Sequence, residues 1–226
     1  MKITVLDSIT LGNDVSPAIL GEFGELDIYG TSAQCEIAGR IADTDIIVTN
    51  KVRLSAEELA KAKNLKLICV TATGYDNIDT AYCADNGIAV CNIAGYSTDS
   101  VAQVTAAMAL ALICHMTEYT NYVNSGAYTS SGSANRLVPV YHEMPSLTWG
   151  VIGVGNIGRK VARIASALGC RVIVNRQRKT DSEFDCVQLD ELLRTADIIT
   201  IHTPLNDRTR NLISREKLSL MKTTAI

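Results

Sequence analysis

A glycine-rich turn between an apolar strand and an amphipathic helix constrains the fold of this 226-residue chain most. Residues 149–169 read WGVIGVGNIGRKVARIASALG and place Gly153, Gly155 and Gly158 in the pattern G-x-G-x-x-G. In a βαβ unit, the first glycine permits a tight turn, the second lets the backbone approach a pyrophosphate, and the third lets helix and strand pack closely. The helix N-terminus then faces the phosphates with its partial positive charge. Since a second apolar strand follows, the pattern predicts a dinucleotide site rather than a merely structural turn.

Strand-like apolar runs alternate with helix-like stretches on both sides of this turn. Continuous runs rich in β-branched residues are typical of strands buried on both faces of a parallel sheet. The expected strands are residues 2–7, 45–50, 66–72, 88–92, 147–155, 170–175 and 196–202. The expected helices are residues 32–43, 55–63, 77–87 and a long one at 97–122, followed by an aperiodic surface connection at 124–146. The alternation predicts an α/β fold with two doubly wound parallel-sheet units.

Charge and composition argue against several classes of partner. A net charge of -3 disfavours binding to nucleic acid or to an anionic membrane, because both are negatively charged themselves. The longest apolar run, residues 101–114, is too short to span a bilayer, and the N-terminus does not resemble a signal peptide, so we expect a cytoplasmic protein. The seven cysteines form no C-x-x-C pair and most lie in apolar runs, so we expect reduced core thiols and no metal site.

The strand that follows the glycine turn and its helix ends in cationic residues, where an acidic residue is usual. An Asp or Glu at this point commonly holds the ribose hydroxyls of NAD. Residues 171–180 instead read RVIVNRQRKT, which brings Asn175, Arg176, Arg178 and Lys179 to this end of the strand. An acid would repel a 2′-phosphate, whereas an arginine can stack on adenine and pair with that phosphate, so we predict that NADP is favoured over NAD. The alternative is a solvated basic loop, with NAD bound through Asn175 and backbone groups.

A further candidate segment, HTPLNDRTRNLI at residues 202–213, follows the last expected strand. It lies at the carboxyl edge of the predicted sheet, where open α/β sheets bind ligands. On the plainer interpretation, Pro204 ends the strand and His202 is a solvated loop residue.

Three segments of the chain resemble the D-isomer-specific 2-hydroxyacid dehydrogenases. They are residues 70–112, which begin VTATGYDNIDTAYCADNGIAV, residues 149–169 around the glycine turn, and residues 196–226, which begin ADIITIHTPLNDRT. The resemblance implies a flavodoxin-like substrate domain at 1–99 and a C-terminally incomplete Rossmann domain for NAD or NADP at 100–226. It also implies a homodimer that pairs through the nucleotide domain and its long helix.

The resemblance further assigns roles to individual residues. The backbone at Thr73 and Gly74 would hold the carboxylate of a small 2-keto or 2-hydroxy acid. The cofactor contacts would come from Gly153, Gly155, Asn156, Ile157, Gly158, Asn175, Arg176, His202, Thr203, Pro204 and Thr209. The family's catalytic Arg, Glu and His lie beyond the segment that matches residues 220–226, so we expect them after Ile226 and none within this chain.

The leading hypothesis is an NAD(P)-dependent oxidoreductase that transfers a hydride between the nicotinamide and a small 2-keto acid, similar to glyoxylate and hydroxypyruvate reductases. The alternative is a dinucleotide-binding fragment without catalysis, or a cofactor-sensing protein like the family's transcriptional co-repressors. The fold alone does not separate these hypotheses, because function depends on the site.

Overall fold

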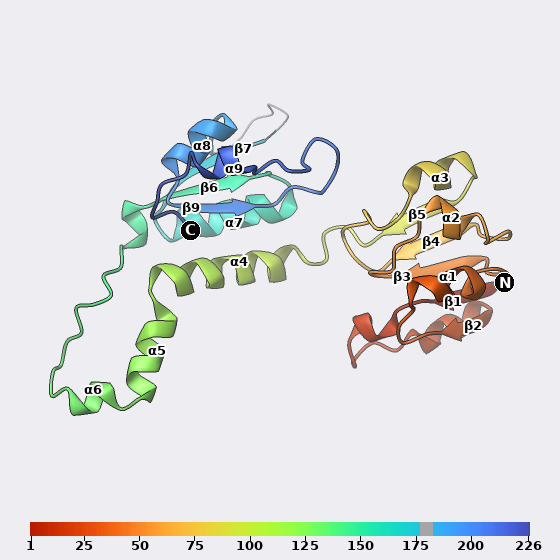
Figure 1. The fold of residues 1–226 in the computed structure, drawn as a ribbon, viewed down its shortest axis with the longest axis horizontal. Coiled ribbons are helices and arrows are strands. Elements are labelled where there is room, and N and C mark those ends of the chain that lie inside the picture. The colour runs from red at the N-terminus through yellow and green to blue at the C-terminus, as the bar shows by residue number, and fades with distance from the viewer. Residues whose placement is uncertain (177–182) are drawn as a thin grey trace. The chain divides into compact units, whose positions relative to one another are not determined.

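A computed structural model describes residues 1–176 and 183–226, which form two compact units that divide after Tyr96. The sequence predicted a division after residue 99. Each unit has a parallel β-sheet with its own buried core (Figure 1). The predicted α/β fold with two parallel sheets is therefore confirmed.

The first unit is built around a five-stranded sheet in the order β2-β1-β3-β4-β5. Its strands are β1 (Lys2–Val5), β2 (Glu25–Ile28), β3 (Ile46–Thr49), β4 (Leu67–Val70) and β5 (Ala89–Asn92). Its helices are the 3-10 helices η1 (Ser8–Leu11) and η2 (Pro17–Phe23) and the α-helices α1 (Gln34–Arg40), α2 (Ala56–Leu59) and α3 (Thr80–Asp85). Gly87 follows the C-terminus of α3 and has a φ of 69°, the left-handed conformation that commonly ends a helix.

The two faces of the first sheet are packed differently. One face joins α1, α2 and α3 in the main core, which includes Ile37, Leu59 and Cys83. On the other face, a smaller cluster contains Ile3, Val5 and Val48, with Leu20 of η2 packed against it. This second face is less completely buried than the first. Near β5 it leaves Ala89 and Cys91 exposed.

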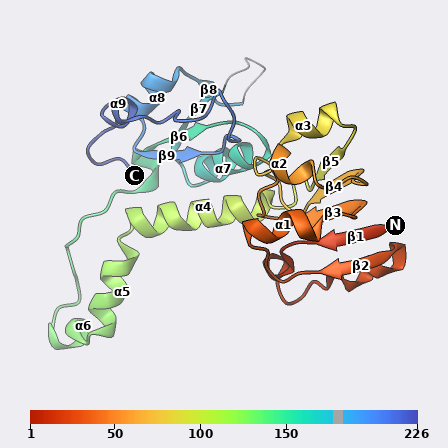
Figure 2. The same ribbon diagram turned by 45° about the vertical axis from the view of Figure 1, so that its right-hand side comes forward.

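The second unit contains a four-stranded parallel sheet in the order β8-β7-β6-β9. Its strands are β6 (Thr148–Ile152), β7 (Arg171–Asn175), β8 (Asp185–Cys186) and β9 (Ile198–Ile201). Its helices are α4 (Thr98–Ile113), α5 (Met116–Asn124), α6 (Ala127–Ser130), the 3-10 helix η3 (Met144–Ser146), α7 (Asn156–Ala167), α8 (Leu189–Thr195) and α9 (Arg215–Leu218). The helices α4 and α7 run alongside each other in both views (Figures 1 and 2), and alanines of both helices share a core with β6.

Two short strands were not predicted from the sequence. Both β2 and β8 lie at the edge of their sheets, and each carries exposed residues. An edge strand needs no continuous apolar run, because part of its surface faces solvent. The apolar runs that predict the central strands are therefore missing from β2 and β8.

The predicted single helix at residues 97–122 is wrong, because the chain forms two helices there. The helices α4 and α5 meet at 65°. His115, which precedes α5, has a φ of 48°, in the left-handed region, and this breaks the helix. Among the described residues, no single helix is long and apolar enough to cross a membrane, and α4 with α5 reaches that length and composition only as a bent pair.

Candidate functional site

The three glycines of the turn have three different environments. Gly153 has a φ of 91°, and a Cβ atom there would lie 2.7 Å from the His202 carbonyl oxygen. A Cβ on Gly158 would lie 1.9 Å from the Gly153 carbonyl oxygen, so the first turn of α7 can approach β6 only with glycine at this position. By contrast, a Cβ on Gly155 would meet no described atom within 4 Å. Gly153 and Gly158 therefore pack closely against other parts of the chain, whereas the space beside Gly155 is open.

This open position lies at the N-terminus of α7, with Gly155 as the N-cap residue. Asn156 and Ile157, two of the expected cofactor contacts, form the start of the helix. No side chain caps this end of the helix in the described part of the chain, so its first N–H groups are available to an anion.

The end of β7 supports the same turn. The Gly153 amide donates to the Asn175 carbonyl at 2.8 Å, which fixes the start of the turn. The Asn175 side chain donates from Nδ2 to the Val187 carbonyl at 2.9 Å and so connects β7 to the segment after β8. Asn175 is therefore a structural residue as well as a candidate ribose contact, and the sequence did not indicate its bond to Val187.

Arg176 directly follows, and its guanidinium has an unusual environment. Both Nε and Nη2 are buried and have no hydrogen-bond partner among the described residues. A buried cationic donor without an acceptor is costly, so this position favours an anionic ligand that supplies one. The other two predicted cations, Arg178 and Lys179, lie outside the described residues.

The segment after β9 packs against the glycine turn at Gly153. The His202 amide donates to the Ile152 carbonyl at 2.7 Å, and the Thr203 methyl carbon would lie 2.7 Å from a Cβ on Gly153. The His202 side chain is half-buried rather than solvated, and its Nε2 has no partner among the described residues. Burial lowers the pKa of His202 below the usual value of a histidine, so its imidazole is neutral at pH 7.

Thr209 stabilises the conformation of the same loop through two hydrogen bonds. Its hydroxyl donates to the Pro204 carbonyl at 2.5 Å and accepts from the Asn206 amide at 2.9 Å. The predicted residues His202, Thr203 and Gly153 therefore meet in space, whereas Thr209 acts on this loop through its hydrogen bonds to the backbone.

The chain is similar in sequence to a known protein family. Residues 106–226 match the family model described as "D-isomer specific 2-hydroxyacid dehydrogenase, NAD binding domain". The chain is 33% identical over 230 residues to the hydroxypyruvate reductase of Blautia hydrogenotrophica, with 98% of this chain and 71% of that protein covered. The chain belongs to the D-isomer specific 2-hydroxyacid dehydrogenases.

Solved structures agree with this family membership. D-lactate dehydrogenase from Aquifex aeolicus, complexed with NAD and lactic acid, has a TM-score of 0.85 and 31% identity, covering 98% of this chain and 66% of that one. An acyclic imino acid reductase in complex with NADPH and D-Arg has a TM-score of 0.86 and 29% identity, covering 98% and 71%. This dehydrogenase chain is therefore an oxidoreductase that uses a nicotinamide cofactor, and the structures with NAD and with NADPH leave its choice between them open.

In the first unit of the dehydrogenase chain, the candidate substrate loop follows β4. The Thr73 carbonyl accepts from Nδ2 of Asn92 at 2.7 Å, and the Thr73 hydroxyl donates to the Ile93 carbonyl at 3.2 Å. The loop is thus connected to the end of β5 by two hydrogen bonds. Gly74, at the tip, is exposed, and its amide donates no hydrogen bond within the described residues.

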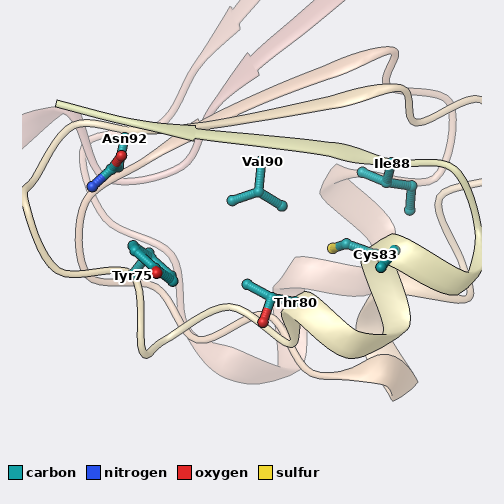
Figure 3. Close-up of a pocket in the computed structure, with 7 residues that line it drawn as sticks. Tyr75, Thr80, Cys83, Ile88, Val90 and Asn92 are labelled. Carbon is teal, nitrogen blue, oxygen red and sulfur yellow. The ribbon is translucent and has the colours of Figure 1, made fainter. Parts of the chain in front are cut away.

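Beside this loop lies a pocket of about 420 Å³ that the sequence did not reveal (Figure 3). Tyr75 and Asn92 lie at one end, next to the candidate substrate loop, and Cys83 and Ile88 lie at the other. The pocket forms between α3 and β5, and apart from Tyr75 its lining comes from residues that local sequence patterns assign to an ordinary helix and strand.

The cysteines depart from the sequence-based expectation. All seven are free, but only Cys83 and Cys170 are buried, while Cys35, Cys91 and Cys186 are exposed. The expectation that most are core thiols is wrong, because three of them lie on edge strands or a helix surface rather than in the apolar centre of a sheet. The described residues contain no group of three or more His, Cys, Asp or Glu that could hold a metal ion.

Proposed function

We propose that this chain is the NADP-preferring part of a reductase for small 2-keto acids such as hydroxypyruvate and glyoxylate. The observation that carries the cofactor preference is Arg176, whose buried Nε and Nη2 lack an acceptor within the described residues. A 2′-phosphate on the adenosine ribose supplies such an acceptor, and the neutral Asn175 does not repel it. The substrate class is supported by the family and by the hydroxypyruvate reductase that the chain resembles.

The residues of the second unit fit a dinucleotide. The first N–H groups of α7 and the open space at Gly155 suit the pyrophosphate, and the His202 segment borders the turn on its other side. The nicotinamide ring supplies the hydride when the cofactor is bound. His202 is neutral and half-buried, and we assign it a binding role, while the acid–base His that the family implies after Ile226 stays a prediction.

In the first unit, the free amide of Gly74 is the candidate donor to a substrate carboxylate. Its exposure leaves room for the ligand, and the bonds from Thr73 to Asn92 and Ile93 hold the loop in place. A fixed backbone donor binds a carboxylate without first having to be ordered, which favours binding.

Replacing Arg176 with alanine tests the cofactor preference. A charge-assisted hydrogen bond contributes about 1.5–3 kcal/mol, and about 1.4 kcal/mol corresponds to a factor of ten in affinity. We therefore expect Arg176→Ala to weaken NADPH binding roughly tenfold or more and to leave NADH binding nearly unchanged, as measured by fluorescence titration.

Arg171→Ala is the matched control, because Arg171 is an exposed arginine at the opposite end of the same strand. The Arg171→Ala variant loses the same charge and should bind NADPH and NADH with almost unchanged affinity. Equal losses for NADPH and NADH in Arg176→Ala, or an equal loss of NADPH affinity in Arg171→Ala, would contradict the proposal.

We also propose that the chain pairs with a second copy through the outer face of α4. Val104, Met108 and Leu112 lie on this face with 55%, 61% and 58% of their surface exposed, whereas Ala102, Ala106 and Ala109 are buried. These three exposed side chains are uncharged, so two copies can bring them together without repulsion, as a symmetric dimer requires.

A charge on this face should disrupt such a dimer. We expect Met108→Glu to shift the protein from dimer to monomer in analytical ultracentrifugation, because a carboxylate would be buried at the interface. Gln103→Glu adds the same charge away from the exposed apolar row and should remain dimeric. An unmutated protein that is monomeric at tens of micromolar, or a Met108→Glu protein that stays dimeric, would rule out this interface.

A further inference from the structure

Two cysteines occupy paired positions on neighbouring strands of the first unit. The strands β4 and β5 are parallel, and their register pairs Cys69 directly with Cys91. Neighbouring strands lie about 4.8 Å apart, within the range of roughly 4.4–6.8 Å that disulfides span between Cα atoms. The pairing therefore meets the main geometric condition for a disulfide without any change of register.

Both thiols project from the same face of the sheet. The residues before and after Cys69 belong to the core with α1, α2 and α3, whereas Cys69 packs with Val48 on the opposite face. Figure 3 shows Val90 and Asn92 pointing into the pocket beside α3. Because side chains alternate along a strand, Cys91 between them points to the face that also carries Cys69.

The two thiols differ in their access to solvent. Cys91 is exposed on β5, an edge strand of the sheet, and Cys69 is partly buried beside it. Burial raises the pKa of the Cys69 thiol, and the nearby Cys91 raises it further. An incoming reagent therefore meets Cys91 first, and Cys69 is the second thiol to react.

We propose that Cys69 and Cys91 form a dithiol site that low-molecular-weight disulfides convert into a reversible cross-strand disulfide. The Cys91 thiolate attacks the reagent disulfide, so that a bond forms to one half and the other half leaves as a thiolate. Cys69 then loses its proton to solvent and attacks the Cys91 sulfur, which expels the second half as a thiolate. The protein loses two protons and two electrons, and the reagent is reduced to two thiols.

The geometry also indicates that this bond is readily reduced. In a parallel sheet, paired Cβ atoms lie about as far apart as the strands, ~4.8 Å, whereas disulfides prefer roughly 3.5–4.5 Å. The strands must move slightly together, and strained disulfides are the more reducible ones. The site thus suits a modification that reverses when the surrounding thiol pool becomes reducing again.

Treatment of the folded 226-residue chain with glutathione disulfide tests this proposal. After acid quenching and digestion without reductant, we expect a peptide pair joined through Cys69 and Cys91, lighter by two hydrogen atoms, which dithiothreitol restores. In Cys69→Ser, Cys91 should instead retain a stable mixed disulfide with glutathione. In Cys91→Ser, Cys69 should react far more slowly, because its exposed partner is gone.

Exposed cysteines elsewhere provide the control. The double variant Cys35→Ser/Cys186→Ser keeps both members of the pair and should form the same cross-link as the unmutated chain. Circular dichroism of each variant before treatment shows whether its fold is intact. Glutathione that stays on Cys91 of the unmutated chain without a cross-link, no reaction at Cys91, or a cross-link that forms only in denaturant would each overturn the proposal.

Discussion

Replacing Gly158 with alanine is expected to destabilise the second unit by at least about 3 kcal/mol. The new Cβ would lie 1.9 Å from the Gly153 carbonyl oxygen and 3.3 Å from a Val151 methyl carbon, so α7 must move away from β6. Because the contact is with backbone, no side-chain rotation relieves it. Urea unfolding monitored by Trp149 fluorescence measures the loss, since the chain's single tryptophan is fully buried in this unit.

Gly155→Ala is the matched control in the same turn. Its Cβ would meet no described atom within 4 Å, so the free energy of unfolding should change by less than about 1 kcal/mol. Dinucleotide affinity should nevertheless fall, because the methyl group occupies the space that lets the backbone approach a pyrophosphate. Equal stability losses in the two variants would contradict the separate roles assigned to these glycines.

Replacing Asn175 with aspartate should change both stability and cofactor choice. The Asn175 amide donates to the Val187 carbonyl, and a carboxylate there would bring two acceptors together. The expected loss of stability is about 1–3 kcal/mol. The added negative charge also repels a 2′-phosphate, so the ratio of NADPH to NADH affinity should fall roughly tenfold or more.

Asn175→Ala separates these two effects. It removes the same hydrogen bond without adding charge, so it should lose about 1 kcal/mol of stability and keep the preference for NADPH. Urea unfolding and cofactor titration on the same preparations provide both measurements. An aspartate variant that is as stable as the unmutated chain, or that keeps its NADPH preference, would show that this side chain does not have the proposed role.

The central strands and the glycine turn could be predicted because each depends on local sequence. β3, β4, β6 and β7 are apolar runs, and a strand buried on both faces has to be apolar along its length. The roles of Gly153 and Gly158 follow from the absence of a side chain at fixed positions of a known turn. The edge strands β2 and β8 lack such an apolar run, and no local pattern reveals them.

Other parts of the site depend on contacts between distant residues. The bond from Asn175 to Val187 and the pairing of Cys69 with Cys91 join residues 12 and 22 positions apart in sequence, and both depend on strand register. Sequence patterns place strands but leave their pairing open. The break at His115 also escaped prediction, because neither glycine nor proline marks it.

Titration of the unmutated chain with NADPH and NADH, at low and at moderate salt, tests the central claim most directly. If Arg176 pairs with a 2′-phosphate, NADPH should bind roughly tenfold or more tightly than NADH at low salt, and the difference should shrink as salt screens the charges. Equal affinities at low salt, or tighter binding of NADH, would contradict the account.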